Sequence, residues 1–369
     1  MNIRATRRAT AAALLSLALL PATLATATVA QAETPLPKPK LTIGKQTTDP
    51  QKVRDYWTAE RVSSAVANEK KDQADFDKKA TAATQGGERK AVKQTLPAQS
   101  VPAVTGKTLA PLATASVVPE MPHAQPVPFP QSQPAVLVGK ILFTAKDGTT
   151  HGCSGSSIVT ANKNTVWTAG HCIHPGDGTG AEGFYKNILF IPGYKKNDMA
   201  PKGYDAPWGE WAANAKVAPT AWTADEDYFW GDMAAFTVTP PSGYTNLTDS
   251  VGAFGYKFGS GPDWPDIIDS GFPGDGYQRT DMDGYTQFYC TGNAEDATPF
   301  FPVDDRLKFD CDMGHGASGG PMSTPEGQIV GANSHGIDDG AGNIVEPVLY
   351  SSAHGDNAID VINRIGTLS

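Results

Sequence analysis

From residue 136 to the C-terminus, short apolar runs alternate with turns rich in Gly, Pro and Asp. The runs contain many β-branched and aromatic residues, which favour strands over helices. We expect strands at residues 136–144, 156–160, 165–168, 188–191, 234–238, 251–256, 329–334 and 348–351. Many short strands separated by turns predict an all-β fold, either a barrel or a sandwich.

The last element expected in the chain is a helix. Ala358, Val361, Ile362 and Ile365 are spaced i, i+3, i+4 and i+7, which places them on one apolar face. Asp356 or Asn357 is expected to cap the start of this helix, because a short polar side chain there can accept a backbone hydrogen bond.

Residues 33–134 differ from the rest of the chain in composition. They are rich in Ala, Pro, Lys, Gln and Thr and contain no cysteine. A modest, imperfect apolar stripe predicts a helical piece within 50–84. The Pro-rich stretch 96–134 is expected to be extended.

The first 32 residues have the pattern of a secretory signal peptide. Arg4, Arg7 and Arg8 precede an apolar stretch, and Ala30-Gln31-Ala32 matches a small-residue cleavage site. An uncleaved membrane anchor is the alternative, since small apolar residues continue to Ala30. Pro21 and the cleavage site favour removal. We therefore expect a secreted, extracellular protein whose mature form has no membrane segment.

Charge is divided unevenly along the chain. Residues 1–134 carry 17 Lys and Arg against 10 Asp and Glu, whereas residues 135–369 carry 13 against 29. An acidic C-terminal region repels phosphate, so we expect no nucleic-acid partner. The acidity either attracts basic peptides or keeps the protein soluble.

Three segments together carry candidate chemistry. Gly316-Ala317-Ser318-Gly319-Gly320-Pro321 places a serine on a glycine-rich turn, and Thr168-Ala169-Gly170-His171-Cys172 contains a histidine. Between them, Asp232 directly precedes the apolar run 233–236. A serine hydroxyl is a poor nucleophile that needs a neighbouring base and a shelter for the oxyanion it forms. The chain order His, Asp, Ser is that of one known type of catalytic triad.

These segments resemble the trypsin-like (chymotrypsin-fold) serine peptidases, and more narrowly the secreted bacterial branch that includes the glutamyl endopeptidases. Cys153-Ser154-Gly155-Ser156, Ile191-Pro192-Gly193-Tyr194 and Asp312 also fit that branch, and the resemblance covers residues 136–369. It implies two six-stranded antiparallel β-barrels with the site in the cleft between them, followed by the C-terminal helix. The expected organisation is a signal peptide at 1–32, a partly helical or disordered pro-region at 33–134 and a peptidase domain at 135–369.

The resemblance implies a secreted serine endopeptidase that works through an acyl-enzyme. Ser318 would be the nucleophile, His171 the proton shuttle and Asp232 the group that orients His171. The backbone N–H groups of Gly316 and Ser318 would form the oxyanion hole. Asp225, Glu226 and Asp227 compete with Asp232, but only Asp232 lies at the mouth of an apolar strand. A non-catalytic binding protein of the same fold and a secreted esterase with the same triad are the alternatives.

The side chain preferred at the cut is left open. Asp312 stands where trypsins carry the aspartate that binds Lys or Arg, which favours basic substrates, but it could equally be structural beside Cys311. His315 adjoins the oxyanion turn. Ser334, His335 and Gly336 lie on the expected pocket strand, and His335 keeps an acidic preference open.

The four cysteines are expected to form disulfides outside the cell. The resemblance pairs Cys153 with Cys172, which leaves Cys290 to pair with Cys311; free buried thiols are the alternative. We expect no cofactor and no metal, although Asp281-x-Asp283-Gly284 gives a faint hint of a calcium loop.

The expected partners are a protein or peptide substrate and the chain's own pro-region, and the mature protein is expected to be a monomer. In animal trypsins an aspartate before the nucleophile pairs with a newly cut N-terminus, but Ala317 cannot form such a pair. Control by a pro-region would therefore work differently, for instance by blocking the cleft. Alternatively, residues 33–134 assist folding or act as a solvated spacer, because such a composition buries little apolar surface.

Overall fold

The computed structural model describes residues 40–85, 94–107, 119–297 and 305–369. The expected signal peptide lies outside these residues. Within the part of the chain described, no helix combines the length and apolarity needed to cross a membrane. Strands account for 37% and helices for 18%, so the predicted β-rich fold is confirmed.

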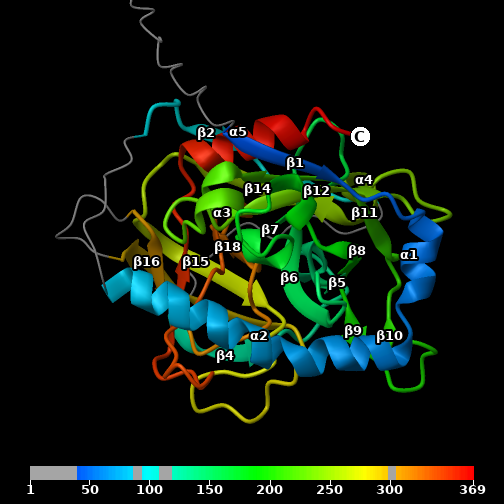
Figure 1. Ribbon diagram of the computed structural model, residues 1–369, viewed down its shortest axis with the longest axis horizontal. Coiled ribbons are helices and arrows are strands. Elements are labelled where there is room, and N and C mark those ends of the chain that lie inside the picture. The colour runs from blue at the N-terminus through cyan, green and yellow to red at the C-terminus, as the bar shows by residue number, and fades with distance from the viewer. Residues whose placement is uncertain (1–39, 86–93, 108–118, 298–304) are drawn as a thin grey trace, which may run out of the picture. The chain divides into compact units, whose positions relative to one another are not determined.

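The first half of the domain is a closed, six-stranded antiparallel barrel (Figure 1). Its strands are β5 (Val138–Thr144), β6 (Thr150–Ile158), β7 (Thr165–Thr168), β8 (Lys186–Pro192), β11 (Trp211–Pro219) and β12 (Ala234–Thr239). They pair in the order β11-β12-β7-β6-β5-β8, and β8 closes the ring on β11. Trp167, Trp211, Phe190 and Phe236 are fully buried and contribute to its core.

The second half is built on a nine-stranded sheet. Its order is β2 (Gln99–Val101), β14 (Gly255–Phe258), β19 (Gln328–Ala332), β18 (Pro321–Ser323), β15 (Trp264–Gly271), β16 (Phe288–Asp296), β17 (Leu307–Asp310) and β20 (Val348–Ser351), with β4 (Met121–Pro126) paired to β16. Ile267, Phe288, Phe309 and Met322 belong to a second apolar core. This sheet system takes the place of the second barrel expected from the resemblance.

Short elements lie between the strands of these two halves. The helices are α3 (Thr220–Asp225) and α4 (Leu247–Val251), and the 3-10 turns are η1 (Ala135–Leu137), η2 (Gly170–Cys172) and η3 (Gly180–Gly183). Two small sheets pair β9 (Lys195–Lys196) with β10 (Tyr204–Asp205), and β3 (Val104–Thr105) with β13 (Gly252–Ala253).

The C-terminal helix α5 (Asp356–Ile365) forms as predicted, and its apolar face is buried against β11 and β12. The predicted cap is wrong, because Gly355 occupies the N-cap position. Asp356 is instead the first helical residue, and its carboxylate accepts hydrogen bonds from the backbone N–H groups of Thr95 and Leu96 (2.9–3.1 Å). The side-chain amide of Asn357 donates to Trp230 O.

The segment before the barrel packs against the rest of the fold and pairs with its strands. The predicted helical piece is two helices, α1 (Pro50–Tyr56) and α2 (Ala59–Gln85). They are separated at Trp57, whose fully buried indole donates to Asn187 O (2.8 Å). β1 (Leu41–Lys45) pairs with β11, and the stretch predicted to be extended supplies β2, β3 and β4. In Figure 1 α2 runs along the lower part of the molecule, and it packs against β5 and β6.

Candidate active site

The glycine-rich turn that carries Ser318 is fastened to barrel strand β6. The backbone N–H of Ser154 donates to Ser318 O (2.7 Å), and the Ser154 hydroxyl donates to Gly316 O (2.8 Å). Gly316 and Gly319 have φ angles of +92° and +79°, which side chains rarely allow. A Cβ atom at Gly319 would lie 2.0 Å from Thr168 Oγ1. The turn therefore needs glycine to approach the barrel this closely.

His171 and Asp232 meet at the end of β7. His171 lies on η2, and Asp232 directly precedes Met233 and β12. Asp232 accepts the backbone N–H of His171 (2.8 Å) and its ring Nδ1–H (3.0 Å to Oδ2). Two bonds to one carboxylate fix both the orientation and the tautomer of the imidazole, so that a neutral ring carries its proton on Nδ1 and leaves Nε2 as an acceptor.

Asp232 is fully buried and stays acidic. Burial works to raise the pKa of Asp232. The charge of His171 and hydrogen bonds from His171 and Ser334 outweigh burial, so the pKa lies below its usual range. The Ser334 hydroxyl donates to Asp232 Oδ2 at 2.5 Å. Asp232 is therefore a carboxylate, able to stabilise a protonated His171.

The competing acids face other partners. Glu226 pairs with Lys79 (2.9 Å), and Asp227 accepts the backbone N–H groups of Phe229 and Trp230. Asp225 ends α3. Of these acids and Asp232, only Asp232 hydrogen-bonds to His171.

Among the described residues the Nε2 atom of His171 has no hydrogen-bond partner, so no hydrogen bond joins it directly to Ser318. The ring of Phe76, from α2, lies over the imidazole with centroids 4.1 Å apart. Phe76 also contacts Trp222 and Tyr228 at 5.9 and 5.1 Å. Catalytic hydrogen bonds often tighten only when substrate binds. Here a helix from the N-terminal segment occupies the space beside the imidazole of His171.

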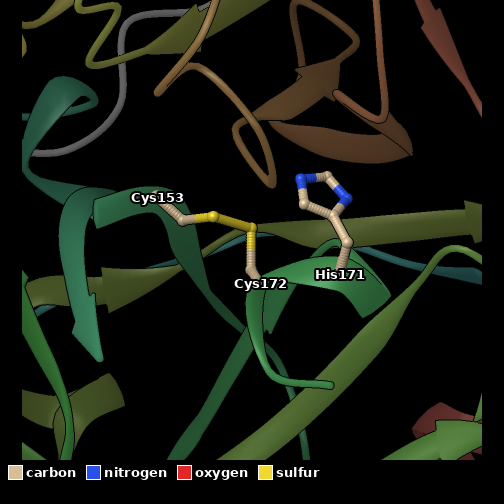
Figure 2. A group of neighbouring side chains, drawn as sticks. All are labelled: Cys153, His171 and Cys172. Atoms are coloured by element: carbon tan, nitrogen blue, oxygen red, sulfur yellow. A yellow bond between two sulfur atoms is a disulfide. The ribbon is translucent and has the colours of Figure 1, made fainter. Parts of the chain in front are cut away.

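Two disulfides brace the region, in the pairing expected from the resemblance. Cys153–Cys172 joins β6 to the turn of His171, as Figure 2 shows, with Cα atoms 6.0 Å apart. Cys290–Cys311 joins β16 to the residue after β17, with Cα atoms 5.8 Å apart. Within the described residues, the groups of metal-ligand atoms that lie close together contain these sulfurs. Disulfide sulfurs are not thiolates, so these groups are poor metal sites.

A small hollow of about 10 Å³ opens beside Ser318. It is lined by Gly314, Ser318, Asn333, Ser334, His335, Gly336, Ile344 and Leu349. The three residues expected on the pocket strand thus lie at the hollow, whereas Asp312 and His315 do not line it. His315 is held by Asp275, which accepts its backbone N–H and its Nδ1–H (2.9 and 2.8 Å).

Asp312 is fully buried and neutralised by its own surroundings. Arg279 Nη1 donates to its Oδ2 (2.8 Å), and His123 Nδ1 lies 3.0 Å from the same oxygen. The backbone N–H of Ala124 donates to Oδ1 (2.8 Å). A carboxylate engaged in this way has little charge left to offer to a substrate.

A series of hydrogen bonds next to the hollow leads to Asp232 and so to His171. Arg306 Nη1 donates to His335 Nε2 (3.1 Å), and His335 Nδ1 lies 3.0 Å from the Ser334 hydroxyl that binds Asp232. Burial first, and then Arg306, holds the pKa of His335 well below its usual range. A neutral His335 accepts from Arg306 and donates to Ser334. The hollow and His171 are thus linked through hydrogen bonds.

Sequence reasoning missed several residues of the site. Arg306 is fully buried, with its guanidinium 4.1 Å from the ring centroid of Phe229 and 5.1 Å from that of Tyr350. Glu69 and Lys140 form a buried ion pair beside the nucleophile turn. These contacts join distant parts of the chain. The one available signal was a charged residue inside an apolar strand, as at Lys140.

Solved structures similar to this chain are serine proteases. Protease Anisep from Arthrobacter nicotinovorans is 28% identical, with a TM-score of 0.54, and the match covers 66% of this chain and 99% of that one. The thermostable serine protease AL20 from an extremophilic microorganism is 25% identical, with a TM-score of 0.52, covering 63% and 98%. A Glu endopeptidase bound to MPD is 19% identical, with a TM-score of 0.49 over 68% and 99%.

No family model matches the sequence, and no curated protein matches it. The structural neighbours confirm the resemblance to chymotrypsin-fold serine proteases. They also support a protease function for this chain.

Proposed function

We propose that this protein is the precursor of a secreted serine endopeptidase. Ser318 attacks the peptide carbonyl, His171 takes its proton, and Asp232 holds the imidazole and stabilises its charge. The backbone N–H groups of Gly316 and Ser318 bind the oxyanion. His171 then protonates the leaving amine, and water attacks the acyl-enzyme to release the acid and restore Ser318. The two disulfides fit an oxidising compartment.

One observation carries this proposal. The fully buried carboxylate of Asp232 accepts hydrogen bonds from the backbone N–H and the ring N–H of His171. The turn of Ser318 is hydrogen-bonded to β6, and the Cys153–Cys172 disulfide joins that strand to the residue after His171. A binding protein of the same fold has no need of this arrangement. The arrangement therefore favours a peptidase over a non-catalytic binding protein.

Residues 33–134 act as the inhibitor of this enzyme. Phe76 covers the imidazole, and Glu69 buries its carboxylate 2.5 Å from where a Cβ on Gly316 would lie, next to the oxyanion donors. Val53, Trp57 and Ala65 are fully buried, which a solvated spacer would not require. A peptide substrate would need the space that α2 fills.

The hollow beside Ser318 favours an acidic substrate side chain. Arg306 places a cation next to His335, whereas the charge of Asp312 is balanced by Arg279. Both ring nitrogens of His335 are engaged, so a carboxylate entering the hollow would be attracted by the charge of the Arg306 guanidinium beside that ring. The geometry therefore supports cleavage after acidic rather than basic residues.

Labelling with a fluorophosphonate probe, combined with peptide hydrolysis, tests the proposed function. The processed protein should be labelled at Ser318, Ser318→Ala should lose both labelling and hydrolysis, and Ser323→Ala should keep both. Asp232→Asn should lower kcat/KM by about 10⁴-fold. Hydrolysis of simple esters without any peptide cleavage would favour the esterase. Retained activity in Ser318→Ala would contradict the proposal.

A further inference from the structure

The carboxylate of Glu69 sits in a receptacle made by the peptidase domain. Its side chain is 1% exposed, and Oε1 accepts a hydrogen bond from Lys140 Nζ on β5. Gly152, Gly274, Gly284 and Gly316 surround it, and we call these four glycines and Lys140 the carboxylate cradle. A Cβ atom on Gly152 would lie 2.0 Å from Oε1, and one on Gly316 would lie 2.5 Å from Oε2. The cradle exists because these positions lack side chains.

Lys140 is an unusual residue for its position. It is fully buried on a barrel strand whose other residues are also buried, and its ammonium lies 5.8 Å from the ring centroid of Phe272. Buried lysines are rare unless they are paired, because removing a charge from water is costly. Here the paired acid belongs to α2. Once α2 leaves, the cation of Lys140 remains in the wall of the cleft, and the domain acids whose charges reach the cradle are Asp275 and Asp283.

The hydrogen bonding of Glu69 in the cradle is incomplete. Its Oε2 atom has no hydrogen-bond partner among the described residues. Burial raises the pKa of Glu69 above its usual range, and Lys140 works against that rise. One oxygen of this buried carboxylate therefore lacks the partner that would stabilise it.

The position of the cradle relative to Ser318 identifies which part of a substrate would reach it. The hollow of Ser334, His335 and Gly336 shares none of the five cradle residues. The cradle instead borders Gly316 and Gly152, and Gly152 adjoins the Cys153–Cys172 disulfide next to His171. Under the proposed function, a substrate with its acyl side in the hollow would leave the cradle, which shares no residue with the hollow, to its leaving-group side.

Resting on the proposed function, we infer that Lys140 selects substrates with an acidic side chain one or two residues after the cleaved bond, and that Glu69 imitates that side chain in the precursor. The enzyme would thus recognise a carboxylate on the leaving-group side of the cleaved peptide bond. The pro-region uses the same cradle that substrates use later.

Cleavage of a peptide library tests this inference. The full chain is folded intact and cut at a recognition sequence inserted between β3 and β4, which leaves β4 and its contacts to Asp312 in place. Gel filtration then removes the pro-region. The library varies the two residues after the cleaved bond, and rates are normalised to the fraction of protein labelled by fluorophosphonate.

Peptides with Glu at one of these two positions should be cut about tenfold faster than those with Gln, a typical effect of one partly buried charge pair. Lys140→Met should remove this difference, Lys140→Arg should keep much of it, and Lys140→Glu should favour Lys. The exposed Lys195→Met serves as the control and should behave like the wild type.

The wild-type library alone can overturn the inference, whether or not a Lys140 variant folds. Equal rates for Glu and Gln peptides in fully labelled protein would show that Lys140 is only a latch for α2. A preference that survives in labelled Lys140→Met would also overturn it. A processed protein that fluorophosphonate does not label would instead contradict the proposed function itself.

Discussion

Asp312 and Glu69 are both carboxylates buried near the nucleophile turn, but their surroundings differ. Asp312 has an arginine, a histidine and a backbone N–H as partners, which together engage both its oxygens. Glu69 has one lysine, and its second oxygen has no hydrogen bond among the described residues. A complete set of partners marks a permanent part of the domain. Glu69 belongs to α2, so under the proposed function it leaves its site when the pro-region is removed.

The largest effect on stability should come from breaking the ion pair of Asp312 and Arg279. Arg279→Ala would leave Asp312 buried without its cation, so we expect the free energy of unfolding to fall by about 3–5 kcal/mol. Chemical denaturation of the full chain measures this change. Arg364→Ala, at an exposed position on α5, is the control. A loss below about 1 kcal/mol would remove the distinction between the two carboxylates.

Breaking the ion pair of Glu69 and Lys140 should weaken inhibition by the pro-region rather than lower the overall stability of the protein. Glu69→Gln weakens the hold of α2 on Lys140, so hydrolysis by the uncut chain should rise about tenfold. Glu60→Gln, an exposed change on the same helix, should leave the rate unchanged. If Glu69→Gln unfolds the protein as readily as Arg279→Ala does, both acids are structural.

A third buried acid, Asp269, has no cationic partner among the described residues and provides a test by pH. Burial raises its pKa to about 8, and its Oδ1 accepts a hydrogen bond from the Asn333 amide (2.8 Å). A raised folded-state pKa favours the folded protein at low pH, and this contribution is lost as pH rises from about 4 to 8. Asp269→Asn should therefore stabilise the protein by about 1 kcal/mol or more at pH 7.

Denaturation of wild type and Asp269→Asn at a series of pH values checks this expectation. The advantage of the variant should grow towards pH 8 and vanish near pH 4. An advantage independent of pH would mean that Asp269 is ionised in the folded protein.

The smallest effect should come from the exposed partner of Arg279. Asp281 binds the same guanidinium through two oxygens, but its side chain is 58% exposed. Exposed pairs contribute little, so Asp281→Asn should change the unfolding free energy by less than about 1 kcal/mol. A loss as large as that of Arg279→Ala would assign the stabilisation to Asp281 rather than to Asp312.

Local patterns were sufficient to predict much of this molecule. The strands at 165–168 and 348–351 were predicted with the bounds that the structure has, and the C-terminal helix follows from its apolar spacing. The nucleophile turn is recognisable because its glycines are required by backbone geometry. Such features depend on neighbouring residues, which the sequence states directly.

Elements that depend on distant contacts were missed. β11, with the sequence WAANAKVAP, is rich in alanine and has weak strand propensity, yet it pairs with β1, β8 and β12. β16 carries Asn, Glu and Asp and is held by β4, β15 and β17. The N-cap of α5 was wrong because Asp356 binds the segment at Thr95 instead. The ion pair of Glu69 and Lys140 spans 71 positions and has no local signature.

The central claim is that Ser318 is a nucleophile activated by His171 and masked by α2. The most direct test compares the rate of fluorophosphonate labelling in the uncut chain with the rate after the pro-region is removed. The account predicts that labelling is confined to Ser318 and becomes about 100-fold faster on removal, a shift equivalent to about 2.7 kcal/mol of masking. Equal rates before and after removal, or a label on another residue, would contradict it.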